Sequence, residues 1–247
     1  MSSVVVESPY RSRRGSAEIV ARRAAAVGCA ALAAGLLVGE LGGRLAMRLL
    51  AAVNPEDGGL LTDDGFSVGQ VTSVGTAQLA LAAIQLTMVG ATVFMLVRPF
   101  LLGRGTTRVA LCAAGFGLTA AALLVDPDGT DFSQLQPLWL AEALFVMLPV
   151  ALVAVFAALA ERWLAPGSWF LSASPARVLP LLALWVLGGP ALLVAVPLFL
   201  GALLVALPAR RRPAAPPAVR WGGRGALVLI AGSGVWNLVS DTAEILG

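Results

Sequence analysis

Three charged residues inside one long apolar stretch are the strongest candidates for a chemical role in this chain. Glu40, Arg44 and Arg48 follow one another at four-residue spacing between residues 24 and 53. In a helix this spacing places them on one face, with the acid before the base, which is the favourable order for an ion pair. Ionisable groups within a membrane span mark a substrate path, or else they fix how helices pack. The residues alone leave both uses open.

Small residues follow the same spacing on a neighbouring face of the stretch. Gly35, Gly39 and Gly43 repeat every four residues, a pattern that lets the backbone of another helix approach closely. A helix over residues 24–53 would be about 45 Å long, which exceeds the roughly 30 Å hydrocarbon core of a bilayer. We therefore expect a membrane-spanning helix with one charged face and one packing face.

The composition indicates an integral membrane protein. Of 247 residues, 58% are hydrophobic and only 13% are charged, and the mean hydropathy is +0.87. Every cation is an arginine, and the pI near 9.6 comes from arginines beside apolar runs instead of a basic face with interleaved aromatic residues. This pattern indicates membrane orientation and argues against nucleic acid as a partner.

The chain lacks the residues that most catalytic and metal sites need. It has no histidine, which removes the commonest general base and metal ligand. Cys29 and Cys112 lie inside apolar runs, and the acidic turn from Asp126 to Asp131 lacks the order of an EF-hand loop. There is also no phosphate-binding GxxxxGK[ST] motif. We predict no enzyme, no catalytic or metal site and no cofactor.

Basic and acidic flanks alternate along the chain. Residues 1–15 are rich in arginine and serine, which predicts a disordered cytoplasmic tail, and residues 16–247 are expected to form one transmembrane domain. The positive-inside rule places the N-terminus and the 98–108 loop in the cytoplasm, and the 54–71 and 126–137 loops outside the plasma membrane. The expected fold is all-α, a polytopic transmembrane helical bundle of about six spans, with a range of five to seven. The spans lie near residues 24–53, 75–97, 109–125, 138–160, 178–207 and 225–246.

The run from 178 to 207 is the hardest to divide into helices. Gly188, Gly189 and Pro190 interrupt it and predict a break or a sharp kink. One helix would be long enough to tilt across the membrane, but it would place the arginines after residue 209 outside. A hairpin keeps those arginines inside, although its first arm of about 11 residues extends only some 16 Å. We favour the hairpin.

Two further polar residues, Gln85 and Glu142, lie inside other spans. Gln85 belongs to a polar seam that repeats every seven residues and should face protein: Gln78, Gln85 and Thr92. Glu142 matches Arg48 in depth, and Glu40 neutralises only one arginine, so we expect Glu142 to pair with Arg48, or with Arg44 one turn deeper. Alternatively, Arg48 extends to the headgroups. The candidate intramembrane polar network is therefore Glu40, Arg44, Arg48, Gln85 and Glu142.

Three short motifs resemble those of a known group of proteins. They are Gly43-Arg44-Leu45-Ala46-Met47-Arg48, Thr62-Asp63-Asp64-Gly65-Phe66 and Asp126-Pro127-Asp128-Gly129-Thr130-Asp131-Phe132. Over about residues 40–165 the chain is similar to small uncharacterised multi-pass integral membrane proteins of high-GC actinobacteria. The resemblance implies a polytopic membrane protein with no assigned activity, so it transfers no site residue.

Two classes of function fit these features. The favoured one is a non-catalytic scaffold, sensor or accessory subunit whose buried charges fix helix packing. The alternative is a small transporter or channel with a polar path lined by intramembrane Glu, Arg and Gln residues. A closed, dry bundle would indicate the first, and a continuous cavity open to one side the second. The expected partners are the lipid bilayer and either a second copy of the chain or another membrane protein, and any small-molecule substrate is unknown.

Overall fold

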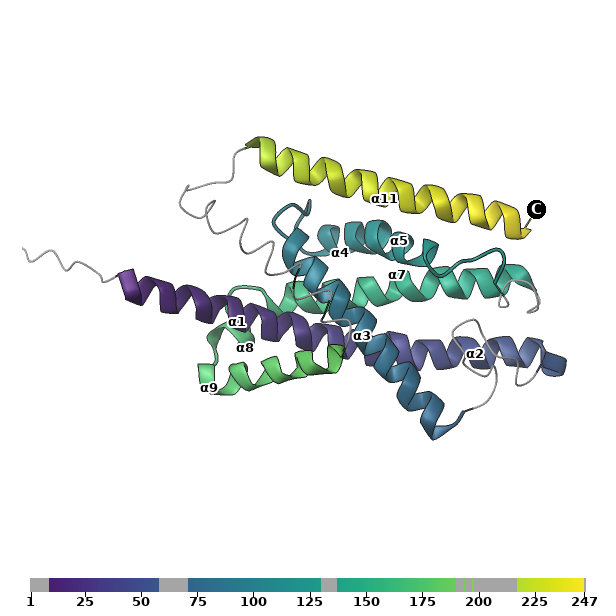
Figure 1. The fold of residues 1–247 in the computed structure, drawn as a ribbon, viewed down its shortest axis with the longest axis horizontal. Coiled ribbons are helices and arrows are strands. Elements are labelled where there is room, and N and C mark those ends of the chain that lie inside the picture. The colour runs from purple at the N-terminus through teal and green to yellow at the C-terminus, as the bar shows by residue number, and fades with distance from the viewer. Residues whose placement is uncertain are drawn as a thin grey trace, which may run out of the picture.

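The computed structural model describes residues 9–57, 71–129, 137–189 and 217–246, together with Leu193 and Pro197. Within these residues every regular element is a helix, as the composition predicts. Most helices lie side by side along the long axis of the molecule, and α3 crosses them obliquely (Figure 1).

The chain begins with one long helix that changes its winding in the middle. It consists of α1 (Pro9–Ala34), the π-helical turn η1 (Gly35–Glu40) and α2 (Leu41–Val53), and a short 3₁₀ turn η2 (Pro55–Asp57) follows. Because α1 already begins at Pro9, residues 9–15 are helical where the sequence predicts a disordered tail. Proline is favoured in the first turn of a helix, where its missing N–H has no intrahelical partner. Residues 1–8 of that predicted tail lie outside the described residues.

The middle of the chain supplies α3, a second helix with a π-turn, and α7. α3 (Ser73–Val97) begins after Thr72, whose side chain accepts a hydrogen bond from the Gly75 backbone N–H. A shorter apolar helix follows, made of α4 (Thr106–Cys112), the π-turn η3 (Ala113–Gly117) and α5 (Leu118–Ala122). α7 (Leu138–Trp163) is continuous through Pro149.

The C-terminal third starts with short helices and ends with a long one. α8 (Trp169–Ser172) and α9 (Pro175–Val178) lead into the 3₁₀-helix η4 (Leu179–Gly188), and α11 (Pro217–Leu246) closes the chain. A 3₁₀-helix rises about 2.0 Å per residue, so η4 alone extends about 20 Å, more than the roughly 16 Å expected of an α-helical arm. It ends where Gly189 takes φ 51 and ψ −138, at the break that the sequence predicts. The second arm of the predicted hairpin lies outside the described residues.

Four helices are long and apolar enough to cross a membrane: Ala17–Val53, Ser73–Val97, Leu138–Trp163 and Val219–Leu246. Two shorter apolar helices, Thr106–Ala122 and Pro175–Gly188, correspond to the third and to part of the fifth predicted span. The structure therefore confirms an all-helical fold with helices apolar enough for a membrane, while the count of about six spans stays a prediction.

Two apolar clusters form the core. The larger one lies where α1 meets α3, α7 and η4, and α1 contributes a row of fully buried alanines to it: Ala25, Ala26, Ala30, Ala31 and Ala34. The smaller cluster contains Leu50 of α2, Ala121 of α5, Ala141 of α7 and Leu238 of α11. α11 packs against α5, and Figure 1 shows it at the edge of the bundle.

Candidate functional site

The charged face of the first span follows directly after a π-turn. The Leu41 backbone N–H donates to the carbonyl of Leu36, five residues earlier, where an α-helix would bond four residues back. A π-turn inserts one extra residue and therefore rotates the following side chains relative to those before it. The spacing of the residues predicts a regular helix, and nothing in the sequence indicates this turn, which lies between the glycines and the charged residues.

Glu40 and Arg44 form an ion pair within this helix. Arg44 Nε lies 3.4 Å from Glu40 Oε1, and the two side chains are only 13% and 9% exposed, respectively. The second carboxylate oxygen, Glu40 Oε2, is buried and accepts no hydrogen bond from the described residues. One of the two arginines is thus neutralised within its own helix, as the four-residue spacing predicts.

Gly35 and Gly39 bring this helix into close contact with α3. A Cβ added to Gly35 would lie 2.9 Å from Thr87 Oγ1 and 3.2 Å from the carbonyl oxygen of Ala83, and a Cβ on Gly39 would overlap the Cβ of Ala83. Gly43 differs, because its added Cβ would make an ordinary contact of 3.5 Å with the nearest heavy atom. The first two glycines of the stripe therefore form the crossing, and the third has room for a side chain.

The hydroxyl groups near the crossing are satisfied within α3. Thr87 Oγ1 donates to the carbonyl oxygens of Ala83 and Ile84 at 2.8 and 2.9 Å, and Thr92 Oγ1 donates to Met88 at 3.0 Å. Both threonines are buried, and because their hydroxyls already donate to carbonyls of α3 they need no water and no partner on another helix. The crossing of η1 with α3 is consequently a closed contact of small residues.

Gln85 contacts the end of η4. A Cβ added to Gly189 would lie 2.9 Å from Gln85 Nε2, and no hydrogen bond within the described residues joins Gln85 to the Glu40–Arg44 pair. Within the polar seam of α3, Gln78 is exposed and does not face protein as the sequence predicts, whereas Thr92 is buried and donates within its own helix.

The expected pair of Glu142 with Arg48 or Arg44 is not formed. Arg48 is exposed on α2, whereas Glu142 on α7 is buried, with 6% exposure, and no ion pair among the described residues includes Glu142. Each four-residue step along an α-helix turns the side chain by about 40°, so Arg48 has left the buried face of Glu40. Counting residues places Glu142 and Arg48 at the same depth along their helices, but it does not show in which direction each side chain points around its helix axis.

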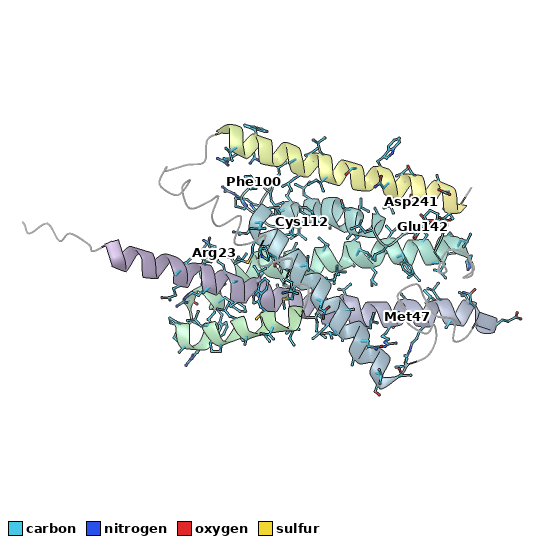
Figure 2. All side chains as sticks on the ribbon, in the orientation of Figure 1. Arg23, Met47, Phe100, Cys112, Glu142 and Asp241 are labelled. Atoms are coloured by element: carbon cyan, nitrogen blue, oxygen red, sulfur yellow. The ribbon has the colours of Figure 1, made fainter. Side chains whose placement is uncertain are left out.

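The candidate polar network is therefore divided among separate places. Glu40 and Arg44 pair beside the crossing, Gln85 meets the end of η4, and Arg48 is exposed. Figure 2 places Glu142 at the same end of the molecule as Asp241 of α11.

Among the described residues, Glu161 pairs with two arginines in a cluster that the sequence does not indicate as a site. We call Arg98, Arg108 and Glu161 the Glu161 cluster. Glu161 Oε1 accepts from Arg98 Nε at 2.9 Å and from Arg108 Nη1 at 3.0 Å. Arg108 Nη2 also donates to the carbonyl of Gly103 at 2.9 Å. The cluster thereby joins the ends of α3, α4 and α7. The sequence feature that could have indicated the cluster is Glu161, a glutamate on the predicted cytoplasmic side, where most charged residues are arginines.

Arg22 and Trp185 join the segment after α7 to α1 through hydrogen bonds that the sequence does not indicate. Arg22 donates to the carbonyls of Leu171 and Ala173 at 3.0 and 2.5 Å. Trp185 Nε1 donates to the carbonyl of Ala24 at 3.1 Å. These contacts join positions about 150 residues apart in the chain, so no local pattern could have indicated them.

The described residues contain no group of three His, Cys, Asp or Glu side chains that could hold a metal ion. Comparison with protein-family models, curated proteins and solved structures finds no match to this chain. The resemblance to small actinobacterial membrane proteins therefore stays a prediction.

Proposed function

We propose that this chain is a non-catalytic integral membrane protein that acts as a scaffold, sensor or accessory subunit. The observation that supports this most is the closed crossing of η1 with α3. Gly35 and Gly39 leave no space there for an added side-chain atom, and the charges beside it, Glu40 and Arg44, neutralise each other within one helix.

The Glu40–Arg44 pair has a sufficient role in folding. A single charge in the middle of a span costs about 2.5 to 3.5 kcal/mol on insertion scales, and an opposite charge one helical turn away reduces that cost. The pair therefore needs no ligand to account for its presence. On this proposal it orients the helix and sets the depth at which α3 crosses.

We also propose that the protein lies in the plasma membrane with its N-terminus in the cytoplasm. Two features support this orientation. Arg23 and Phe100 lie toward one end of the bundle, while Glu142 and Asp241 lie toward the other (Figure 2). The Glu161 cluster joins arginines at the ends of two helices, as expected of a basic cytoplasmic side.

One labelling experiment tests both proposals. Single cysteines are placed at Leu60, Gln85 and Thr87 in a chain whose Cys29 and Cys112 are replaced by alanine, and an impermeant thiol reagent is applied before and after lysis. We expect position 60 to react in intact cells and positions 85 and 87 to react in neither condition, because thiols in a dry contact are not reached. Reaction at 87 would contradict the closed crossing, reaction at 85 would indicate a water-filled path beside η4, and reaction at 60 only after lysis would reverse the orientation.

A small transporter or channel is the second candidate, and the two π-turns favour it. η1 and η3 both lie within apolar helices, and single π-turns are frequent at functional sites. On this alternative, Gln85 lines a water-filled path. The labelling of Gln85→Cys therefore separates the two candidates.

A further inference from the structure

The turn between α3 and α4 meets the start of α11 at one corner of the bundle. A Cβ added to Gly223 would lie 2.5 Å from Cδ1 of Phe100, so the ring lies directly on the backbone of α11 (Figure 2). Arg224 is the next residue of α11, and the ion pairs of Arg98 and Arg108 with Glu161 join the turn to α7. We call this corner the basic corner, formed by residues 98–108 and 219–224.

Positive charge at the basic corner exceeds negative charge. Glu161 is one carboxylate shared by Arg98 and Arg108, so one of these two charges is left uncompensated. Arg104 and Arg224 take part in no ion pair among the described residues. An anion is therefore the ligand that the corner would attract.

Two guanidinium donors at the basic corner are buried without an acceptor. Arg108 Nε and Arg224 Nε make no hydrogen bond among the described residues. The guanidinium carbon of Arg224 lies 5.1 Å from the centre of the Trp221 ring, an arrangement that holds the guanidinium in place. A buried N–H group without an acceptor is costly, and the oxygen of an anion would satisfy it with a charge-assisted hydrogen bond.

Apolar side chains stand exposed beside these arginines. Trp221 and Val219 of α11 and Leu102 of the turn are all exposed. Tryptophan is typical of the level where headgroups meet acyl chains. The surface at the corner thus combines uncompensated arginines with apolar side chains, which suits a ligand that is both anionic and apolar.

We propose that the basic corner binds an anionic phospholipid, with a phosphate oxygen on Arg224 and an acyl chain along Trp221. A free phosphate ion shares the headgroup chemistry, but it would gain nothing from the exposed apolar side chains. The lipid is the ligand that uses both parts of the corner.

The test measures lipid binding to the full-length protein in detergent by native mass spectrometry. Phosphatidylglycerol and phosphatidylcholine are titrated separately against the wild type, Arg224→Gln and Arg177→Gln. Arg177 of α9 is an exposed arginine outside the basic corner, so Arg177→Gln is the control for the loss of one positive charge. We expect the wild type to prefer phosphatidylglycerol about fivefold, the effect of one arginine near an anionic headgroup. Arg224→Gln should lose this preference, and Arg177→Gln should keep it.

Three results would overturn the proposal: equal binding of both lipids by the wild type, equal losses in the two variants, or complete displacement of phosphatidylglycerol by an equal concentration of inorganic phosphate. The last result would indicate a site for soluble anions.

Trp221→Ala, which keeps every arginine, should weaken phosphatidylglycerol binding, and an unchanged affinity would remove the role of the acyl chain. If Arg224→Gln does not fold, Arg224→Lys serves in its place, because it keeps the charge and removes the Nε donor.

Discussion

The first and last helices that could span a membrane, Ala17–Val53 and Val219–Leu246, have different surroundings. In the most apolar window of Ala17–Val53, 56% is buried inside the protein, against 11% in Val219–Leu246. α1 buries a row of alanines, whereas α11 contacts the bundle along one line that includes Gly223, Gly234 and Leu238. Hydropathy indicates that both helices can cross a membrane. The fit between small residues and the facing helix determines which of them forms the core.

Glycine shows the same difference at single positions. Gly39 in η1 has no space for a Cβ because Ala83 of α3 occupies it, whereas a Cβ on Gly232 of α11 would meet no atom within 4 Å. Both glycines belong to helices that could span a membrane. The residue type alone therefore does not distinguish a packing glycine from an exposed one.

The largest expected effect comes from enlarging these two glycines. Gly39→Leu forces η1 away from α3 and should lower the free energy of unfolding by about 3 kcal/mol, the upper part of the usual range for overpacking. Gly232→Leu adds an apolar side chain to an exposed face and should change it by less than about 0.5 kcal/mol. Reversible unfolding in mixed micelles measures both.

Equal losses in the two glycine variants would contradict the comparison. They would mean that α11 is packed as closely as η1 in the folded protein. Gly43→Ala offers an intermediate test, because the added Cβ makes an ordinary contact at 3.5 Å, and we expect a change of less than about 1 kcal/mol.

The sequence predicts the helical class well and the packing partners poorly. Apolar run length and charged flanks locate helices because each is a property of a few consecutive residues. The π-turn at Gly35–Glu40 and the 3₁₀ winding of Leu179–Gly188 depend on what the neighbouring helices allow, so no local pattern shows them. Gly35 and Gly39 lie against α3 in the structure, and their spacing in the sequence could not identify Ala83 as the residue they contact.

A second difference between the inner helices and α11 concerns charge. Glu161, whose side chain is 14% exposed, accepts hydrogen bonds from two arginines of other helices. Glu161→Gln leaves both guanidinium groups without a carboxylate and should lower the free energy of unfolding by about 2 kcal/mol, after allowance for screening of the partly exposed Arg98. Thermal unfolding in detergent measures the loss.

Glu244→Gln on α11 is the matched control for this prediction. Glu244 is exposed and forms no ion pair among the described residues, so its replacement should change stability by less than about 0.5 kcal/mol. If high salt removed the whole difference between the two variants, the Glu161 cluster would be an ordinary surface pair.

The two glutamates of α7 show why the charged site was only partly predictable. Glu142 and Glu161 lie on the same helix, and the matching depths of Glu142 and Arg48 predict an arginine partner for Glu142. The structure gives partners to the second, because the ends of α3 and α4 converge beside Glu161 while Arg48 turns outward from α2. The depth of a residue in its helix follows from counting residues. Which helix ends meet at that residue depends on loop geometry and on the rotation of each helix about its axis.

The smallest expected effect concerns Trp185 of η4. Its ring lies against Gly28 of α1 and donates a hydrogen bond to the carbonyl of Ala24. Trp185→Phe removes the bond to Ala24 but leaves that carbonyl with its own helical N–H partner, so the loss should be about 1 kcal/mol. Trp236 of α11 is exposed, and Trp236→Phe should leave stability within about 0.5 kcal/mol of the wild type.

Gly28 turns the Trp185 prediction into a measurement of coupling. A Cβ on Gly28 would lie 2.6 Å from Trp185 Nε1, so Gly28→Ala displaces the ring and should lower the free energy of unfolding in the wild type. In a Trp185→Ala chain the same change meets no ring and should be neutral or slightly stabilising, because alanine favours the helix. A double-mutant cycle gives the interaction energy directly. Additive losses would show that η4 does not rest on α1 at Gly28, and would leave η4 as loosely attached as α11.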